Sequence, residues 1–343
     1  MRFDSFLRIF ARCFVVALFF GVVSVVVLTA YGYRYDRQEN RLEPTGIIRV
    51  NGAYRELQIV LDGTLLAQNL PASISGVKEG FHRLEISKMG YASWRRDVRV
   101  QSGMITNVPT LILVPDDVQT ASKRVISVKD FFKTPVQLVS ASPEALIFFD
   151  GTRYSYVDIP KAKKYPLSFP KELEGVVLDV TDRAGYAFKK NALVGLSINL
   201  ETRKISITRE DPFSYSREGL QFIRFAPGFQ EFLYEKGGEI ASIVLNLSQS
   251  KKFFTRFAEP VKNLSWYRDT NHFVVQVGDR LQFCDETFGN CFLIRAMMDQ
   301  DSFSVTQDGI YSYIASTGEV LFLPLSSGEN TFLSYIFSEQ VSL

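Results

Sequence analysis

The chain has 343 residues, and its 39 Lys and Arg stand against 37 Asp and Glu, for a formal net charge of +2. This near balance argues against a nucleic-acid-binding protein, because such proteins normally carry a large basic excess. The 29 Phe, 15 Tyr and 2 Trp supply core material and favour strands, so we predict a mainly β protein of two domains.

The first predicted element is an uncharged apolar segment from Phe14 to Tyr33, with the sequence FVVALFFGVVSVVVLTAYGY. As a helix, 20 residues reach about 30 Å, the thickness of the hydrocarbon core of a bilayer. Tyr31 and Tyr33 stand at its far end, where aromatic rings favour the headgroup level. We therefore predict a transmembrane helix over residues 14–33 that contacts the lipid bilayer. A cleaved signal peptide is the alternative, although its apolar region is usually only about 7–15 residues long.

The flanks of this segment carry equal numbers of basic residues, so the positive-inside rule does not orient it. These are Arg2, Arg8 and Arg12 before the segment and Arg34, Arg37 and Arg41 after it. The much longer body after the segment favours a cytoplasmic tail over residues 1–13 and an extracytoplasmic body. The expected location is the cell membrane, with a single pass. Residues 34–45 (RYDRQENRLEPT) are polar and are predicted to form a juxtamembrane stalk.

Residues 46–116 show short alternating strands separated by Gly-containing turns, which predicts a small β-sandwich. The predicted strands are Ile47–Val50, Leu57–Leu61, Phe81–Ile86, Trp94–Val100 and Thr110–Val114.

The order of motifs in this region is similar to that of the bacterial PEGA domain. The motifs are Ile59–Gly63 (IVLDG), Glu79–Ile86 (EGFHRLEI), Lys88–Tyr91 (KMGY) and Val98–Gly103 (VRVQSG). The tetrapeptide that names the family is absent, and Asn51-Gly52-Ala53 stands in its place. The resemblance implies a surface or envelope module that acts as a spacer or adhesive domain, with no catalytic residues.

His82 matches the histidine of this family. It shares a strand face with Leu84 and Ile86, so we predict a packed, hydrogen-bonded core residue in preference to a ligand. The basic residues of this region are interpreted as an ordinary solvated sheet face, with a weak basic face for anionic envelope polymers as the alternative. Its residues are Arg83, Lys88, Arg95, Arg96 and Arg99.

Residues 117–134 are predicted to be a connector, and residues 135–343 contain a loose repeat. Polar turns followed by aromatic-rich strands start at 141, 181, 226, 268 and 306, in steps of 40, 45, 42 and 38 residues. A period near 40 with several strands per unit is typical of propeller blades. The region resembles WD-repeat-like propellers without their signature dipeptides, and five blades are expected. Phe332–Phe337 would close the ring, and an irregular second sandwich is the alternative.

Cys284 and Cys291 flank a predicted hairpin turn at Gly289-Asn290. Their thiols would lie nearly opposite each other, which allows a disulfide in an oxidising compartment. Two buried free thiols are the alternative. A zinc site is disfavoured because no histidine is near in sequence.

Residue patterns that would indicate catalysis are scarce. Two histidines, His82 and His272, leave little room for a triad or metal cage. The carboxylate pairs Glu210-Asp211 and Asp299/Asp301 are interpreted as solvated loop acids. We predict no cofactor and no enzymatic activity.

The sequence thus predicts a membrane-anchored structural or binding protein of the bacterial cell envelope, whose β domains contact a protein or a glycan. A membrane-tethered hydrolase that acts on envelope polysaccharide is the alternative, and a sensor or assembly factor is a third reading. Converging carboxylates in a central pocket would favour the hydrolase.

Overall fold

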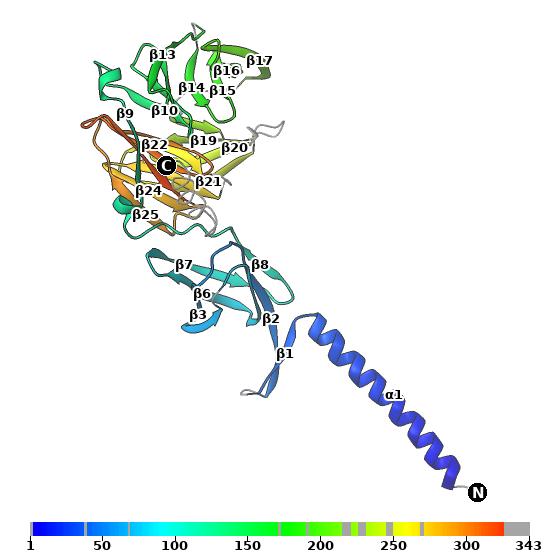
Figure 1. Cartoon of the computed structure of the whole chain (residues 1–343). Coiled ribbons are helices and arrows are strands. Elements are labelled where there is room, and N and C mark those ends of the chain that lie inside the picture. Colours follow the sequence, from blue (N-terminus) through cyan, green and yellow to red (C-terminus); the bar gives the residue numbers. More distant parts are fainter. Residues whose placement is uncertain are drawn as a thin grey trace. The chain divides into compact units, whose positions relative to one another are not determined.

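The computed structural model describes residues 3–37, 40–67, 69–170, 173–189, 192–214, 221–225, 231–244, 250–267 and 271–325. The chain divides into one compact unit that ends at Ile112 and a second that begins at Leu113 and also takes residues 90–92 (Figure 1). Each unit is described here by itself.

The first unit begins with α1 (Phe3–Ala30), a continuous helix. The turn after it contains Gly32, whose φ of +85° lies in the left-handed region that favours glycine. A Cβ at Gly32 would lie 2.5 Å from Thr45 O and 2.8 Å from Gly103 N, so only glycine fits there. No helix within the described ranges combines the length and the apolar character that crossing a membrane requires.

The stalk expected over residues 34–45 is instead a β-hairpin. β1 (Tyr33–Asp36) pairs antiparallel with the start of β2 (Arg41–Val50). The polar sequence suggested a solvent-exposed segment, but Glu43 is buried. Its negative charge is paired with Arg41 at 2.9 Å and with Lys78 at 2.7 Å. Because ion pairs allow charged residues to be buried, a strand can have the polar sequence that is typical of a solvated linker.

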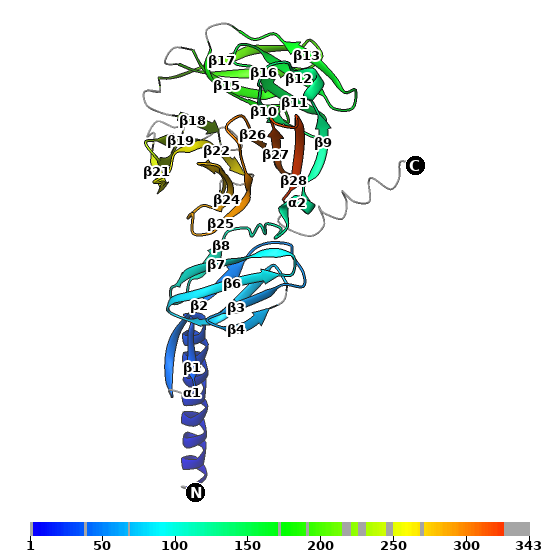
Figure 2. The same cartoon turned by 90° about the vertical axis from the view of Figure 1, so that its left-hand side faces the viewer.

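The described residues after α1 form two four-stranded sheets in the first unit (Figure 2). One sheet contains β1, β2, β5 (Ala72–Lys78) and β8 (Ile105–Val108), and β8 pairs in parallel with β2. The other has the order β4 (Thr64–Ala67), β3 (Gln58–Leu61), β6 (Gly80–Lys88) and β7 (Tyr91–Val100).

The core of the first unit includes the fully buried side chains of Ile48, Ile59, Leu84 and Ile86. The predicted strand Thr110–Val114 is wrong. Its apolar side chains are buried, but the residues lie outside any strand, and β8 is the last strand in the described part of this unit.

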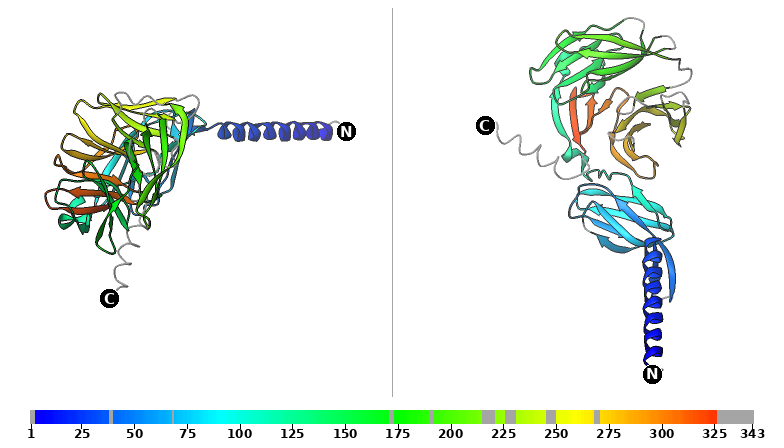
Figure 3. Two further views of the ribbon diagram at one scale, coloured as in Figure 1. Left: turned by 90° about the horizontal axis from the view of Figure 1, so that it is seen from above. Right: turned by 90° about the vertical axis from the view of Figure 1, so that its right-hand side faces the viewer.

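Within its described residues, the second unit contains five four-stranded antiparallel sheets (Figure 3). The first sheet has β10 (Gln137–Ala141), β11 (Ala145–Phe149), β12 (Tyr154–Asp158) and β13 (Lys163–Leu167). The second sheet has β14 (Glu174–Asp179), β15 (Ala184–Lys189), β16 (Ala192–Asn199) and β17 (Lys204–Ser214). The third sheet has β18 (Gln221–Phe225), β19 (Glu231–Lys236), β20 (Glu239–Val244) and β21 (Lys251–Arg256).

The fourth sheet has β22 (Val261–Tyr267), β23 (His272–Val277), β24 (Arg280–Asp285) and β25 (Cys291–Ala296). The fifth sheet has β26 (Ser302–Val305), β27 (Gly309–Ile314), β28 (Glu319–Pro324) and β9 (Lys123–Ser127). The first strands β10, β14, β18, β22 and β26 contact one another in that order, and β26 also contacts β10. The sheets are therefore the blades of a closed propeller.

The predicted mainly β fold and its repeated hairpins are confirmed. The five hairpins found in the sequence are the second and third strands of the five sheets, from β11–β12 to β27–β28. An irregular second sandwich is excluded by the ring order of the first strands.

The ring closes through a segment that was predicted to be part of a connector. Within residues 117–134 lie α2 (Val118–Ala121), β9 and the short 3₁₀-helix Lys129–Phe131. β9 pairs antiparallel with β28, with Ser127 opposite Glu319 and Lys123 opposite Phe322. The strand Phe332–Phe337, proposed for closure, lies outside the described residues.

Side chains also join the first and fifth sheets. The rings of Phe148 and Tyr313 meet edge to face at 5.4 Å between centroids, inside a buried cluster shared by both sheets. Ser302 Oγ accepts a hydrogen bond from Leu138 N at 2.7 Å, which links the first strands of these two sheets. Closure thus rests on both packing and hydrogen bonds.

Candidate functional site

The second unit contains a pocket of about 770 Å³ between its fourth and fifth sheets. Its walls come from three separate parts of the sequence: α2 with the residues beside it, the strand β25, and one face of the fifth sheet. The lining residues are Asp116, Asp117, Val118, Gln119, Ser122, Arg124, Leu293, Ile294, Arg295, Ala296, Ser312, Leu321 and Leu323.

One wall is a row of side chains across the fifth sheet. Ser312 on β27 stands opposite Leu321 on β28, which stands opposite Arg124 on β9. Because side chains alternate along a strand, Leu323 shares this face, whereas Phe322 points into the core with the first sheet. The closing strand β9 therefore supplies one side of the pocket. Arg124 lies 3.3 Å from Glu319, so part of its charge is already paired.

The second wall is the turn around α2, whose polar groups bond to one another. The carboxylate of Asp117 accepts hydrogen bonds from Thr120 N at 3.0 Å and Thr120 Oγ1 at 2.6 Å. The hydroxyl bond, followed by the backbone bond, lowers the pKa of Asp117. Ser122 Oγ donates to Val118 O at 2.6 Å. This wall is held in place by its own hydrogen bonds.

The third wall carries Arg295, on the outer strand of the fourth sheet. Its Nε is buried, and no described residue accepts a hydrogen bond from it. Burial lowers the pKa of Arg295, and the charge of Asp301 opposes that shift. Both carboxylate oxygens of Asp301 are engaged, since Oδ1 accepts from Ala315 N and Oδ2 from Met298 N, each at 2.8 Å. The pocket thus contains a guanidinium that the described part of the protein leaves incompletely satisfied.

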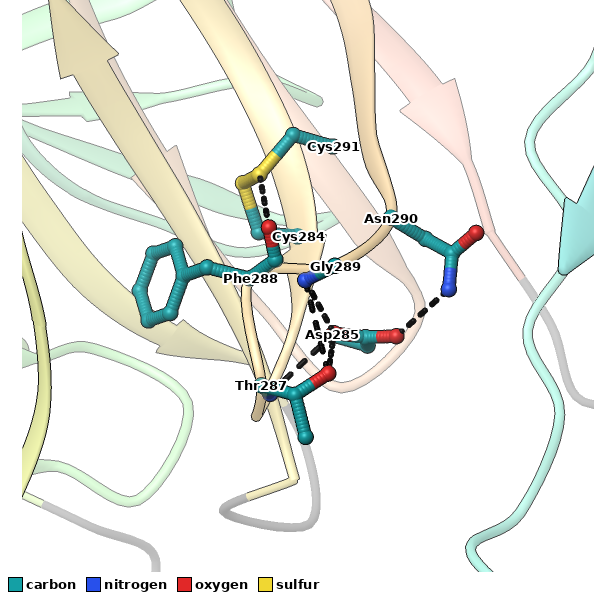
Figure 4. The surroundings of a disulfide bond; sticks show 7 residues. All are labelled: Cys284, Asp285, Thr287, Phe288, Gly289, Asn290 and Cys291. Carbon is teal, nitrogen blue, oxygen red and sulfur yellow. Dashed lines mark hydrogen bonds between the residues drawn. A yellow bond between two sulfur atoms is a disulfide. The ribbon is translucent and has the colours of Figure 1, made fainter. Parts of the chain in front are cut away.

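A disulfide fixes the beginning of the strand that carries Arg295. Cys284 on β24 stands directly opposite Cys291 on β25, with 2.04 Å between the sulfur atoms and 4.1 Å between the Cα atoms. Figure 4 shows how the carboxylate of Asp285 organises the turn between them. Its Oδ1 accepts from Thr287 N at 3.1 Å and its Oδ2 from Asn290 Nδ2 at 2.8 Å. Disulfide and turn together hold β25 in register four residues before Arg295.

The predicted hydrogen bonding of His82 is confirmed, whereas its side chain is only partly buried and is not a core residue. Its Nδ1 lies 2.6 Å from Asp62 Oδ2, and its Nε2 lies 2.8 Å from Lys78 O. Asp62 Oδ1 also accepts from Arg83 N at 2.8 Å. Burial acts to raise the pKa of Asp62, but the bonds from His82 and Arg83 outweigh it and lower that pKa. This group ties the turn after β3 to β6.

The five predicted basic-face residues do not share one face. Arg83, Arg95 and Arg99 alternate with the buried residues of β6 and β7 and point to solvent, whereas Lys88 and Arg96 have the opposite parity. Two of the exposed three are paired with acids: Arg83 lies 3.1 Å from Asp97, and Arg95 lies 2.7 Å from Glu85. Arg99 lies over the ring of Phe81, and Lys88 Nζ donates to Arg55 O.

The predicted carboxylate pairs do not converge. Asp299 is exposed and lies 2.6 Å from Lys262, whereas Asp301 is buried, so the interpretation of Asp301 as a solvated loop acid is wrong. Glu210-Asp211 lies within β17 and not in a turn. The side chains of these two residues are not among those that the structure describes. Among the described residues no group of three or more His, Cys, Asp or Glu could hold a metal ion.

A family model and several solved structures match parts of this chain. Residues 45–112 match the PEGA domain. The structural neighbours are β-propeller proteins, among them a gluconolactonase from Xanthomonas campestris (11% identity, 56% of this chain and 86% of that chain, TM-score 0.37). Another is the propeller domain of Swd1 from Myceliophteria thermophila (13% identity, 82% and 98%, TM-score 0.27).

A third similar structure is PorZ, a surface component of the type-IX secretion system of Porphyromonas gingivalis (10% identity, 82% of this chain and 33% of that chain, TM-score 0.29). A comparison with curated protein sequences finds no match.

Proposed function

We propose that this chain is a binding protein of the bacterial cell envelope, held in the membrane by its N-terminal helix, with both β units on the extracytoplasmic side. The PEGA match over residues 45–112 supports an envelope role for the first unit. The propeller would supply the binding site, in the pocket between its fourth and fifth sheets.

The observation that carries the membrane part of this proposal is the surface of α1. Eleven large apolar side chains between Phe14 and Val27 are 39% to 63% exposed. At about 100° per residue they cover every side of the helix, so no polar face could lie against water. A helix that is apolar all round requires an apolar environment, and a bilayer provides one.

The Cys284–Cys291 disulfide supports the extracytoplasmic side, because disulfides persist in oxidising compartments. The contents of the pocket favour binding over hydrolysis. A glycosidase of the usual kind needs two carboxylates that flank the scissile bond. Here the carboxylate of Asp117 is already bonded to Thr120, and the Nε of Arg295 has no acceptor among the described residues.

Membrane attachment is tested by cell fractionation of the full-length chain followed by an alkaline carbonate wash. We expect the chain to stay in the membrane pellet. A Val22→Lys, Val26→Lys variant should shift to the wash, because a charge near the centre of a membrane helix costs about 2.5–3.5 kcal/mol. A matched Val22→Leu, Val26→Leu variant should stay in the pellet. Recovery of the unmodified chain in the soluble fraction with its N-terminus intact would refute the anchor.

A further inference from the structure

We propose that the pocket between the fourth and fifth sheets binds a carboxylate attached to an aliphatic group, and that Arg295 pairs with that carboxylate. The inference rests on the proposed binding role but not on the proposed membrane location. It concerns only residues of the second unit.

The state of Arg295 points to an anion. A buried N–H without an acceptor is uncommon, because removing it from water without a new bond costs free energy. The Nε of Arg295 is such a group among the described residues, and Asp301 already bonds to two backbone amides. The planar guanidinium donates two parallel bonds to a carboxylate. Because the Nε itself is shielded from solvent, a carboxylate in the pocket would pair with the terminal nitrogens of the same guanidinium.

The charge balance of the pocket favours a monoanion over a phosphate dianion. Arg124 and Arg295 are matched in formal charge by Asp116 and Asp117, all of them lining residues. Arg124 is further neutralised by Glu319 at 3.3 Å. A second negative charge on the ligand would face the two aspartates without a free cation to match it, and like charges at short range repel. Because these formal charges leave no net positive charge, every negative charge on a ligand is opposed, and a monoanion is opposed less than a dianion.

The rest of the lining fits an aliphatic portion of the ligand. Apolar side chains line the pocket beside the guanidinium, and they come from all three walls. They are Val118, Leu293, Ile294, Ala296, Leu321 and Leu323. The volume of about 770 Å³ lies within the usual range of small-molecule sites, roughly 300–1,000 Å³. Such a site would accept the free C-terminal end of a short peptide with an aliphatic last residue.

The test uses the full-length chain in nanodiscs of zwitterionic lipid and measures binding by calorimetry. The probes are N-acetyl-Ala-Leu with a free carboxylate, the same peptide with a C-terminal amide, and inorganic phosphate. We expect the free acid to bind at least about tenfold more tightly than the amide and than phosphate, since a charge-assisted pair is worth more than about one decade.

Two variants locate the site and one variant is the control. Arg295→Gln should weaken binding of the acid about tenfold or more, and Ala296→Trp should abolish it by filling the pocket. Arg280→Gln should change nothing, because Arg280 is on the same sheet but exposed and paired with Glu259. A melting curve for each variant shows whether it is folded. If Arg295→Gln is not folded, the binding measured for Ala296→Trp tests whether the ligand occupies the pocket.

Absence of binding by the free acid, equal binding of acid and amide, or tighter binding of phosphate would overturn the proposal. So would full affinity in both pocket variants. None of these results bears on whether the chain is anchored in the membrane, which the carbonate wash decides separately.

Discussion

Replacing Arg295 by methionine should make the protein more stable while it removes the anion site. Methionine keeps the unbranched aliphatic stem and removes the guanidinium, whose Nε is buried and without an acceptor among the described residues. An unsatisfied buried donor costs about 1–3 kcal/mol. Only part of the Arg295 side chain is buried, so we take the lower end, about 1 kcal/mol. In a domain of this size, that gain raises Tm by about 2–4 °C.

The assay is differential scanning calorimetry of the full-length chain in nanodiscs at pH 7 without ligand. The control is Arg280→Met on the neighbouring strand, where an exposed ion pair with Glu259 is lost. Exposed pairs contribute about 0–1 kcal/mol, so this variant should be unchanged or slightly less stable. If Arg295→Met lowers Tm by 2 °C or more, Arg295 stabilises the empty fold, and the reasoning that it is retained for a ligand is refuted.

Three further predictions concern other parts of the fold. Asp62→Asn should cost up to about 1 kcal/mol at pH 7 in urea unfolding, a small value because the carboxylate is half exposed. The lowered pKa of Asp62 means that its stabilisation is present above about pH 4 and lost below it, so the cost should shrink at pH 3; an unchanged difference would exclude the His82 pairing. Phe148→Ala should cost about 3–5 kcal/mol, and a double-mutant cycle with Tyr313→Ala should give a coupling of about 0.5–1.5 kcal/mol; zero coupling would mean that these two rings do not contact each other. Replacing Cys284 and Cys291 together by alanine should cost about 2–3 kcal/mol by loop closure, and equal stability would show that no bond forms.

The sequence predicted the middle of each propeller sheet better than its edges. Strands such as β11 and β23 are buried along nearly their whole length, so their apolar runs are visible in the sequence. The outer strands β13 and β21 are mostly exposed and start with two lysines, which resemble a loop. Strand propensity is weak where one face meets water and no neighbour is known.

The closing strand and the pocket could not be predicted, because both depend on pairing between distant segments. β9 pairs with β28, which lies almost 200 residues later, and no local pattern specifies such a partner. Arg295 follows the apolar residues Leu293 and Ile294 in the sequence, just as Arg49 and Arg224 follow apolar pairs. That its Nε lacks an acceptor becomes visible only when the surrounding sheet is assembled.

The same limit applies to the first unit. The Asp62-Gly63 turn and the strand of His82 were both predicted, but the bond of 2.6 Å between Asp62 and His82 depends on the pairing of β3 with β6. The hairpin of β1 and β2 was missed because its charges are paired across strands, with Lys78 on β5 reaching Glu43. Sequence alone shows the charges but not their partners.

The most direct test of the central claim is protease accessibility in spheroplasts that express the full-length chain with a different epitope tag at each end. If α1 anchors the chain with both β units outside the cytoplasm, added protease should remove the C-terminal tag and leave a small membrane-bound fragment with the N-terminal tag. Loss of both tags only after the membrane is permeabilised would place the β units in the cytoplasm and contradict the account.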